Sequence, residues 1–394
     1  MRSSPLSLTA AACLAGLSAC SDSPAQLEPE STDAPASVPS ARARVIPGRF
    51  IITLRDGENP AVVAGAHGVR PEFVYTHALT GFAGAMADAA RAGLLRDRRV
   101  IRIEPDGIAT IVATTEGNAT WGLDRLDQRS LPLSSTFTYT STGIGVTAYI
   151  IDTGIRFGHD DFGGRATSGY DAVDGGTAAD CNGHGTHVAG TVGGSRYGVA
   201  KRVHLVAVRV LDCGGSGTWS GVIAGIDWVV RRHVSSAVAN LSLGGGANAS
   251  VDDAVRRMIA AGVSTAIAAG NGNSAGIAQN ACNLSPARVS TAMTVGATDR
   301  NDRKATWSNY GSCVDWFAPG VGITSTWFTS NSATNTISGT SMAAPHTAGV
   351  AALYLQLHPG RTPQQVRDAL FAATTKDIVR NSNTANNDLL FTRY

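Results

Sequence analysis

Short apolar runs rich in β-branched residues recur beyond residue 114 and alternate with longer segments of helical pattern. Strands that are apolar along their whole length are typical of a parallel sheet that helices cover on both faces. The pattern therefore predicts one large α/β domain over residues 114–394, with a mainly parallel sheet. Its candidate strands are residues 146–151, 204–211, 238–243, 264–269 and 292–297.

Two helical segments of this domain have recognisable ends. Ser250 with Asp253 three positions later fits a capping box, and Gly262 fits the glycine that follows a helix. The run 362–365 combines threonine at the N-cap, proline at the first helical position and glutamine at the third. We expect helices to begin at both places.

A smaller segment of mixed pattern precedes the large domain. Strand-like runs at 50–54 and 100–104 enclose helix candidates at 60–67 and 88–96. Residues 44–113 are therefore expected to form a small α+β module. On pattern alone, this module could be an independent ferredoxin-like domain.

The first residues have the pattern of a bacterial export signal. Arg2 provides the positive charge, an apolar core covers residues 6–17, and small residues precede Cys20. The run 17–20 also resembles the lipoprotein processing box, in which Cys20 would be lipidated; the alternative is an ordinary secretory signal. Residues 21–43 are rich in Pro, Ser, Ala and acidic residues, which predicts a disordered tether. We expect a protein exported from a bacterial cell, either lipid-anchored in the envelope or released.

Composition excludes some classes of partner. The chain has 394 residues and a formal net charge of +2, with both signs interspersed, which argues against nucleic-acid binding. No apolar run of about 18 residues follows the N-terminus, so any membrane contact would be through the lipid. We expect a monomer.

An acid, an imidazole and a hydroxyl each lie in a glycine-rich turn. Asp152 follows the first predicted strand of the large domain, His184 lies in the run 182–190, and Ser341 in the run 339–346. Alone, Asp152 would be interpreted as a turn former and Ser341 as a helix N-cap. His184 and His187 have an H-x-x-H spacing, but the zincin pattern needs a different spacing and a glutamate. The position two after Ser341 is alanine, which counts against the nucleophile elbow of α/β-hydrolases.

Together, the three motifs and their flanks closely resemble those of the subtilisin-like serine proteases (peptidase S8 family), nearest the aqualysin subgroup of the proteinase K branch. The resemblance implies a subtilisin-like three-layer fold and an endopeptidase that cleaves polypeptides through an acyl-enzyme. It implies that Ser341 is the nucleophile, His184 the general base and Asp152 the group that orients it. His187 would then be structural.

The resemblance also implies an oxyanion donor and a substrate groove. Asn271 would donate through its side-chain amide, together with the backbone N–H of Ser341. Two backbone edges would clamp an extended peptide as an added strand, with pockets that prefer apolar or aromatic residues and tolerate others. The implied substrate-binding residues are Gly215, Ser216, Gly217, Trp219, Ser242, Leu243, Gly244, Ala268, Ala269, Gly270 and Thr340.

The module at 44–113 resembles the inhibitory propeptide of the same family, especially at 47–51 and 101–105. This implies a zymogen that cleaves itself near Ala113–Thr114, with its own propeptide as intramolecular inhibitor. The alternative function is a catalytically inactive peptide-binding or surface protein, against which the complete set of active-site residues argues.

Four cysteines follow the export signal in the large domain, and in an exported chain an even number suggests disulfides. The count alone allows three pairings; zinc ligation is less favoured because no C-x₂-C pair is present. The resemblance implies the pairs Cys181–Cys213 and Cys282–Cys313.

No catalytic cofactor is expected, but the family resemblance implies structural Ca²⁺, which prefers oxygen ligands. One site would use Asp315 with the carbonyls of Ser290 and Ala292. Another would use Asp124, Asp127 and Gln128. Asp377 is a weaker candidate because Arg129 stands at its usual partner position.

Overall fold

The computed structural model describes residues 45–77, 79–107 and 113–394, which form two compact units divided between Thr110 and Ile111. The export signal at 1–20, the lipidation at Cys20 and the tether at 21–43 lie outside the described residues. None of the described helices is both long enough and apolar enough to cross a bilayer.

The second unit is built on a seven-stranded parallel sheet. All five strands predicted from the apolar runs are confirmed, each with its ends within two residues of the expected ones. Two edge strands were missed, because one has few apolar residues and the other is only four residues long. The spatial order is β15 (Trp316–Pro319), β14 (Met293–Thr298), β12 (Val263–Ala268), β10 (Ala237–Leu241), β7 (Thr147–Asp152), β9 (His204–Arg209) and β8 (Ala166–Asp171).

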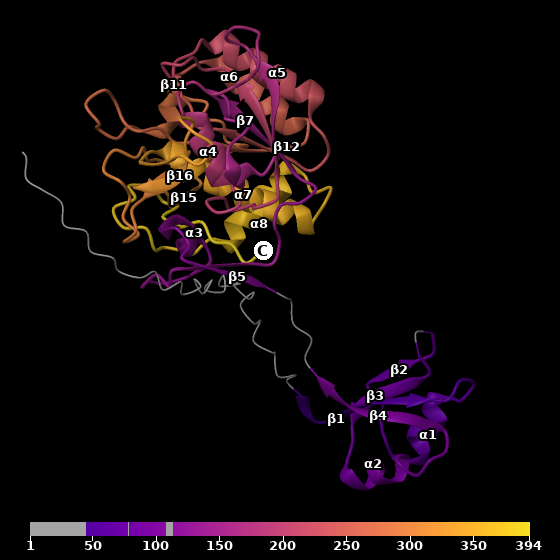
Figure 1. The fold of residues 1–394 in the computed structure, drawn as a ribbon. Helices are drawn as coiled ribbons and strands as arrows, with labels where there is room; N and C mark the ends of the chain where they lie inside the picture. Colours follow the sequence, from indigo (N-terminus) through magenta and orange to yellow (C-terminus); the bar gives the residue numbers. More distant parts are fainter. Residues whose placement is uncertain (1–44, 78, 108–112) are drawn as a thin grey trace, which may run out of the picture. The chain divides into compact units, whose positions relative to one another are not determined.

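Helices cover both faces of this sheet, as Figure 1 shows. One apolar core lies between the sheet and α4 (His184–Gly193), α7 (Thr340–Leu357) and α8 (Pro363–Ala373). A second core lies on the other face, under α5 (Trp219–Arg232) and α6 (Ala249–Ala260). This is the three-layer α/β architecture, with a parallel sheet covered on both faces, that the sequence predicted.

Shorter elements surround the three layers. They are α3 (Trp121–Leu126), the pair β5 (Thr114–Gly117) and β6 (Thr136–Tyr139), the pair β11 (Gly245–Gly246) and β13 (Leu284–Ser285), the hairpin of β16 (Ile323–Thr326) and β17 (Thr334–Ile337), and the 3₁₀ turns η1 (Asp160–Phe162) and η2 (Ala281–Asn283).

The two predicted helix starts had different outcomes. Thr362 and Gln365 form the expected reciprocal capping box of α8, with Pro363 in the first turn. The capping box at Ser250 is wrong, because Asn248 caps α6 by accepting a hydrogen bond from the backbone N–H of Val251 (3.1 Å). Ser250 therefore lies inside the first turn.

The first unit is a four-stranded antiparallel sheet with two helices, in the chain order and strand order of a ferredoxin-like module. Its elements are β1 (Val45–Leu54), α1 (Pro60–Ala66), β2 (Phe73–Tyr75), β3 (Gly81–Ala85), α2 (Asp88–Leu94) and β4 (Val100–Gly107). The sequence predicted both helices, the second half of β1 and the first five residues of β4, but not β2 and β3. The helices pack on one face of the sheet around Ile52, Phe82 and Leu94.

Candidate active site

The segments with candidate chemistry meet at one edge of the parallel sheet. Asp152 is the last residue of β7, and the segments 211–217, 242–244 and 269–271 follow β9, β10 and β12. The carboxyl ends of parallel strands share an edge, where open sheets hold their ligands. Helices α4 and α7 begin there, with His184 and Ser341 in their first turns.

Asp152 and His184 form a hydrogen-bonded pair. Asp152 is fully buried, and its Oδ1 lies 2.7 Å from His184 Nδ1 and 2.8 Å from the backbone nitrogen of Thr153. Burial disfavours the imidazolium, but the charge and hydrogen bond of Asp152, aided by the charge of Asp180, outweigh it and raise the pKa of His184. With Nδ1–H donated to the carboxylate, Nε2 is left as the basic nitrogen.

Asp180 holds the loop that carries His184. Its carboxylate accepts hydrogen bonds from the backbone nitrogens of Asn182, Gly183 and Thr186, each at 2.9 Å. It also accepts one from the hydroxyl of Thr153, the neighbour of Asp152 (2.9 Å). Sequence reasoning missed Asp180, because an aspartate two positions before Asn-Gly is an ordinary turn former.

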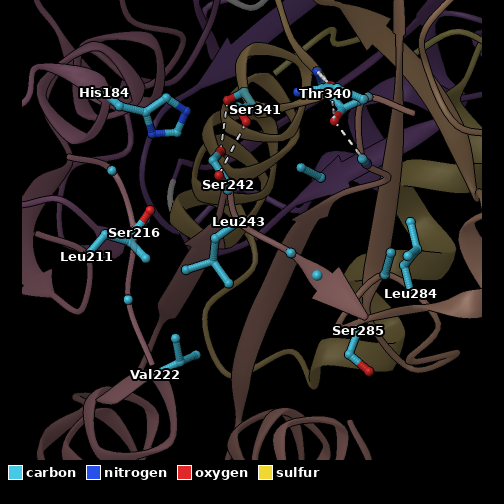
Figure 2. Close-up of a pocket in the computed structure, with 18 of the residues that line it drawn as sticks. His184, Leu211, Ser216, Val222, Ser242, Leu243, Leu284, Ser285, Thr340 and Ser341 are labelled. Atoms are coloured by element: carbon cyan, nitrogen blue, oxygen red, sulfur yellow. Dashed lines mark hydrogen bonds between the residues drawn. The ribbon is translucent and has the colours of Figure 1, made fainter. Parts of the chain in front are cut away.

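Ser341 is half-buried at the mouth of the site. Its hydroxyl donates to the carbonyl of Ser242 (3.2 Å), and the Ser242 hydroxyl donates back to the carbonyl of Ser341 (2.8 Å). In Figure 2 the imidazole of His184 points toward Ser341. Catalytic hydrogen bonds are often poorly aligned before substrate binds, so this geometry is compatible with proton transfer between them.

Asn271 is held in place by hydrogen bonds to its amide oxygen. Oδ1 accepts from the backbone nitrogen and the hydroxyl of Thr340, both at 2.8 Å. Thr340 also accepts from the backbone N–H of Gly270 (3.0 Å). The two donors of Asn271 Nδ2 are therefore on the other branch of the amide and available to a ligand of the groove.

One groove of about 870 Å³ contains His184, Asn271, Ser341 and every residue of the predicted substrate clamp. Figure 2 shows its walls, with Ser216 and Leu243 on facing segments. Residues that sequence reasoning missed also line it: Leu211, Val222, Leu284, Ser285 and Ala287. The sequence could have indicated Val222, since it lies three positions after Trp219 and therefore on the same face of α5. No sequence pattern marks residues 284–287.

Comparison with known proteins decides the family. A model described as the subtilase family (Peptidase_S8) matches residues 143–390. The chain is 49% identical to an extracellular serine proteinase of Thermus sp. (strain Rt41A), with 95% of both chains covered. The chain belongs to the subtilase family. It is a subtilisin-like serine endopeptidase.

Further relatives of this subtilase agree. It is 48% identical to alkaline serine exoprotease A of Vibrio alginolyticus over 84% of this chain and 61% of that protein. A crystal structure of a cold adapted subtilisin-like serine proteinase is 53% identical, with a TM-score of 0.68 over 71% of this chain and all of the other.

Two disulfides brace the subtilase unit. Cys181 is joined to Cys213 (S–S 2.00 Å) and Cys282 to Cys313 (S–S 2.18 Å), the pairs that the resemblance implied. The first connects the loop before His184 to the turn after β9. There the side chain of Asn182 also donates to the carbonyl of Cys213 (3.0 Å).

The second histidine of the H-x-x-H run has no access to the groove of this subtilase. His187 is fully buried, and its Nε2 donates to the carbonyl of Ile323 (3.0 Å). Within the described part of the chain, no cluster of three or more His, Cys, Asp or Glu side chains could hold a metal ion.

The two expected calcium sites of this subtilase differ in whether their carboxylate oxygens already have partners. At Asp127, Oδ1 is buried without a hydrogen-bond partner, and burial, aided by the charge of Asp124, raises the pKa of its carboxyl. An added cation would relieve both penalties, so Asp127 fits Ca²⁺. The carboxylate of Asp124 instead accepts hydrogen bonds from Gln128, Ser134 and Ser135. At Asp315, one oxygen is paired with the guanidinium of Arg367 and the other accepts from the backbone of Thr294. The arginine already neutralises that carboxylate, so Asp315 does not fit.

Proposed function

We propose that this chain is an exported subtilisin-like endopeptidase that cleaves peptide bonds with Asp152, His184 and Ser341 as its triad. The observation that carries the proposal is the 2.7 Å hydrogen bond that His184 Nδ1 donates to the fully buried carboxylate of Asp152. The same histidine shares one groove with Ser341. A buried carboxylate fixes the tautomer of the imidazole and stabilises its protonated form.

The proposed reaction proceeds in two halves. Ser341 Oγ bonds to the scissile carbonyl carbon as its proton moves to His184 Nε2, and the oxyanion receives hydrogen bonds from Asn271 Nδ2 and the Ser341 N–H. The carbon–nitrogen bond then breaks, and His184 gives its proton to the leaving amine. Water repeats these steps on the acyl-enzyme, which releases the acid product and restores Ser341.

The proposed substrate is an extended peptide that lies between the segments 215–217 and 242–244. Ala268, Ala269 and Gly270 would surround the side chain before the cut, and they offer no charge to pair with one. Trp219 and Leu243, with Leu211 and Val222 beside them, would form an apolar pocket further along. We therefore propose broad specificity with a preference for apolar or aromatic residues.

Turnover of peptide p-nitroanilides by the purified mature protein tests this function. Substrates with Phe or Leu before the cut should be cleaved with higher kcat/KM than matched peptides with Asp or Lys. Binding of the same peptides without any turnover would instead support the inactive peptide-binding alternative.

We further propose that the first unit is an inhibitory propeptide and that the N-terminal signal directs export. The 49% identical Thermus relative is named an extracellular proteinase. The sheet of this unit carries its helices on one face, and Phe73 and Ile101 are exposed, with 56% and 62% of their surface accessible. Mass analysis of the exported precursor will show whether Cys20 carries a lipid.

Self-processing predicts that the Ser341→Ala protein, made in a protease-deficient host, accumulates as an uncut precursor. The nucleophile that would cut near Ala113–Thr114 is then absent. Gel mobility and N-terminal sequencing check this, and a trace of mature wild-type enzyme should complete the cut in trans. Spontaneous appearance of the mature form of the variant would exclude self-processing.

Structural calcium is proposed at Asp127, with Asp124 and Gln128 close by. Removing a ligand that binds only the native state should lower stability, by about 3 kcal/mol where the ion stood at a hundred times its Kd. EDTA should therefore lower the Tm of the Ser341→Ala protein, and Ca²⁺ should restore it. Asp127→Asn should abolish the calcium response, whereas Asp315→Asn should keep it; equal responses in all three proteins would refute this site.

A further inference from the structure

Asn309 is a buried residue that does not itself line the groove, yet all of its side-chain hydrogen bonds go to the loop of the proposed oxyanion donor. The side chain is fully buried. Its Nδ2 donates to the carbonyl of Ala269 (2.8 Å), and its Oδ1 accepts from the backbone nitrogens of Gly272 (3.0 Å) and Gln279 (2.7 Å). Its own backbone N–H donates to the carbonyl of Gly270 (2.9 Å).

We propose that Asn309 is a positioning residue that fixes the backbone of Asn271 so that its amide meets the oxyanion; this role rests on the proposed function. Gly270 and Gly272, the two chain neighbours of Asn271, are both bonded to Asn309. Both have positive φ, +99° and +82°, so the loop turns sharply on either side of Asn271. At Gly270 a Cβ would lie 2.4 Å from Asn309 Nδ2, which shows how closely the turn fits around this side chain.

Asn271 is thereby held from two directions. Thr340 fixes the side-chain oxygen, and Asn309 fixes the main chain on both sides. Residues 273–277, further along the loop, are exposed and bond mainly to one another through Asn273. Without Asn309, the Asn271 side chain would keep its hydrogen bonds to Thr340 on α7. The backbone that carries this side chain would no longer be held in place.

The segment that precedes Asn309, residues 304–308, is itself held by hydrogen bonds. Ser308 Oγ accepts from the backbone nitrogen of Ala297 on β14 (3.0 Å). The ammonium of Lys304, which is 7% exposed, donates to the carbonyls of Ala305 (3.1 Å) and Ser308 (2.9 Å). Asn309 therefore links the oxyanion loop to the central sheet, which is what a positioning group requires.

This role predicts a separation of kcat from KM. The oxyanion forms only in the transition state, whereas the two backbone edges at 215–217 and 242–244, between which the extended peptide would lie, make no hydrogen bond to the Asn309 side chain. A displacement of about 1 Å in a stabilising group can cost on the order of 100-fold in rate. Loss of Asn309 should thus reduce kcat and leave KM nearly unchanged.

The test measures initial rates on a peptide p-nitroanilide for wild type, Asn309→Ala, Asn271→Ala and the double variant. Asn309→Ala should lower kcat by about tenfold or more, with KM changed by less than about twofold. In the Asn271→Ala background the same change should lower kcat by less than about twofold, because the positioned group is already gone. The matched control is Asn273→Ala, which removes two side-chain hydrogen bonds from the tip of the same loop and should retain wild-type kcat.

Asn309→Asp provides a second variant if the alanine protein does not fold. It keeps an acceptor for the N–H groups of Gly272 and Gln279 but loses the donor to Ala269, and it too should lower kcat at constant KM. An effect of full size in the Asn271→Ala background, or a rise in KM alone, would overturn the proposal. So would loss of cooperative unfolding in both variants, which would assign Asn309 to stability. An inactive wild type would instead overturn the proposed function.

Discussion

Ser341→Ala is expected to lower kcat for peptide hydrolysis by about 10⁶-fold with little change in Tm, a magnitude that comes from subtilisin itself. The substitution removes the attacking oxygen and one hydrogen bond, that to the carbonyl of Ser242, from a half-buried position. Residual hydrolysis should remain above the rate in water, because Asn271 and the peptide-binding edges are untouched. Kinetics with a chromogenic peptide and a thermal scan measure both parts.

Two histidine variants, His184→Ala and His187→Ala, provide a matched comparison for this prediction. His184 should behave like Ser341, since the members of a triad act as a unit. His187 is fully buried against Ile323 and lies outside the groove, so its loss should reduce stability more than kcat. Asp152→Asn should also nearly abolish activity, because the imidazole tautomer is no longer fixed. The reverse order of the two histidine variants would show that His187 is the base.

The sequence was most informative where local chemistry and the sheet pattern coincide. Asp152 could be placed at a carboxyl edge because the apolar run before it had to be a buried strand. His184 and Ser341 could be placed in glycine-rich turns, which the structure shows at the starts of α4 and α7. Thr362 was found for the same reason, as its capping partners are within three residues.

What the sequence could not predict depends on contacts between distant segments. Asn309 meets Ala269 across 40 positions, and Arg367 meets Asp315 across 52. No local pattern distinguishes these residues from surface asparagine or arginine. At α6, Asn248 and Ser250 are both good caps, and the hydrogen bond of Asn248 to the buried Val251 decides between them.

The second unit is expected to lose stability as the pH falls from about 6.5 toward 4. His187 and His346 are fully buried, and burial lowers the pKa of each to about 4. For His187, the charges of His184 and His346 add to this lowering. Between pH 6.5 and 4 the unfolded chain binds protons at these positions and the native state does not, so unfolding is favoured. Each histidine can contribute about 3 kcal/mol to this loss.

The titration of His184 changes stability in the opposite direction. Its pKa is raised in the native state, so its contribution is present below its unfolded pKa and is lost as the pH rises through the native one. Acid should still lower the free energy of unfolding overall, because the effects of His187 and His346 together oppose the single effect of His184. Urea unfolding of the Ser341→Ala protein at pH 7, 6, 5 and 4.5 measures the slope without autolysis. His346→Gln should flatten that slope, since glutamine does not titrate, and a pH-independent free energy of unfolding in the parent would show that neither histidine stays neutral in the native state.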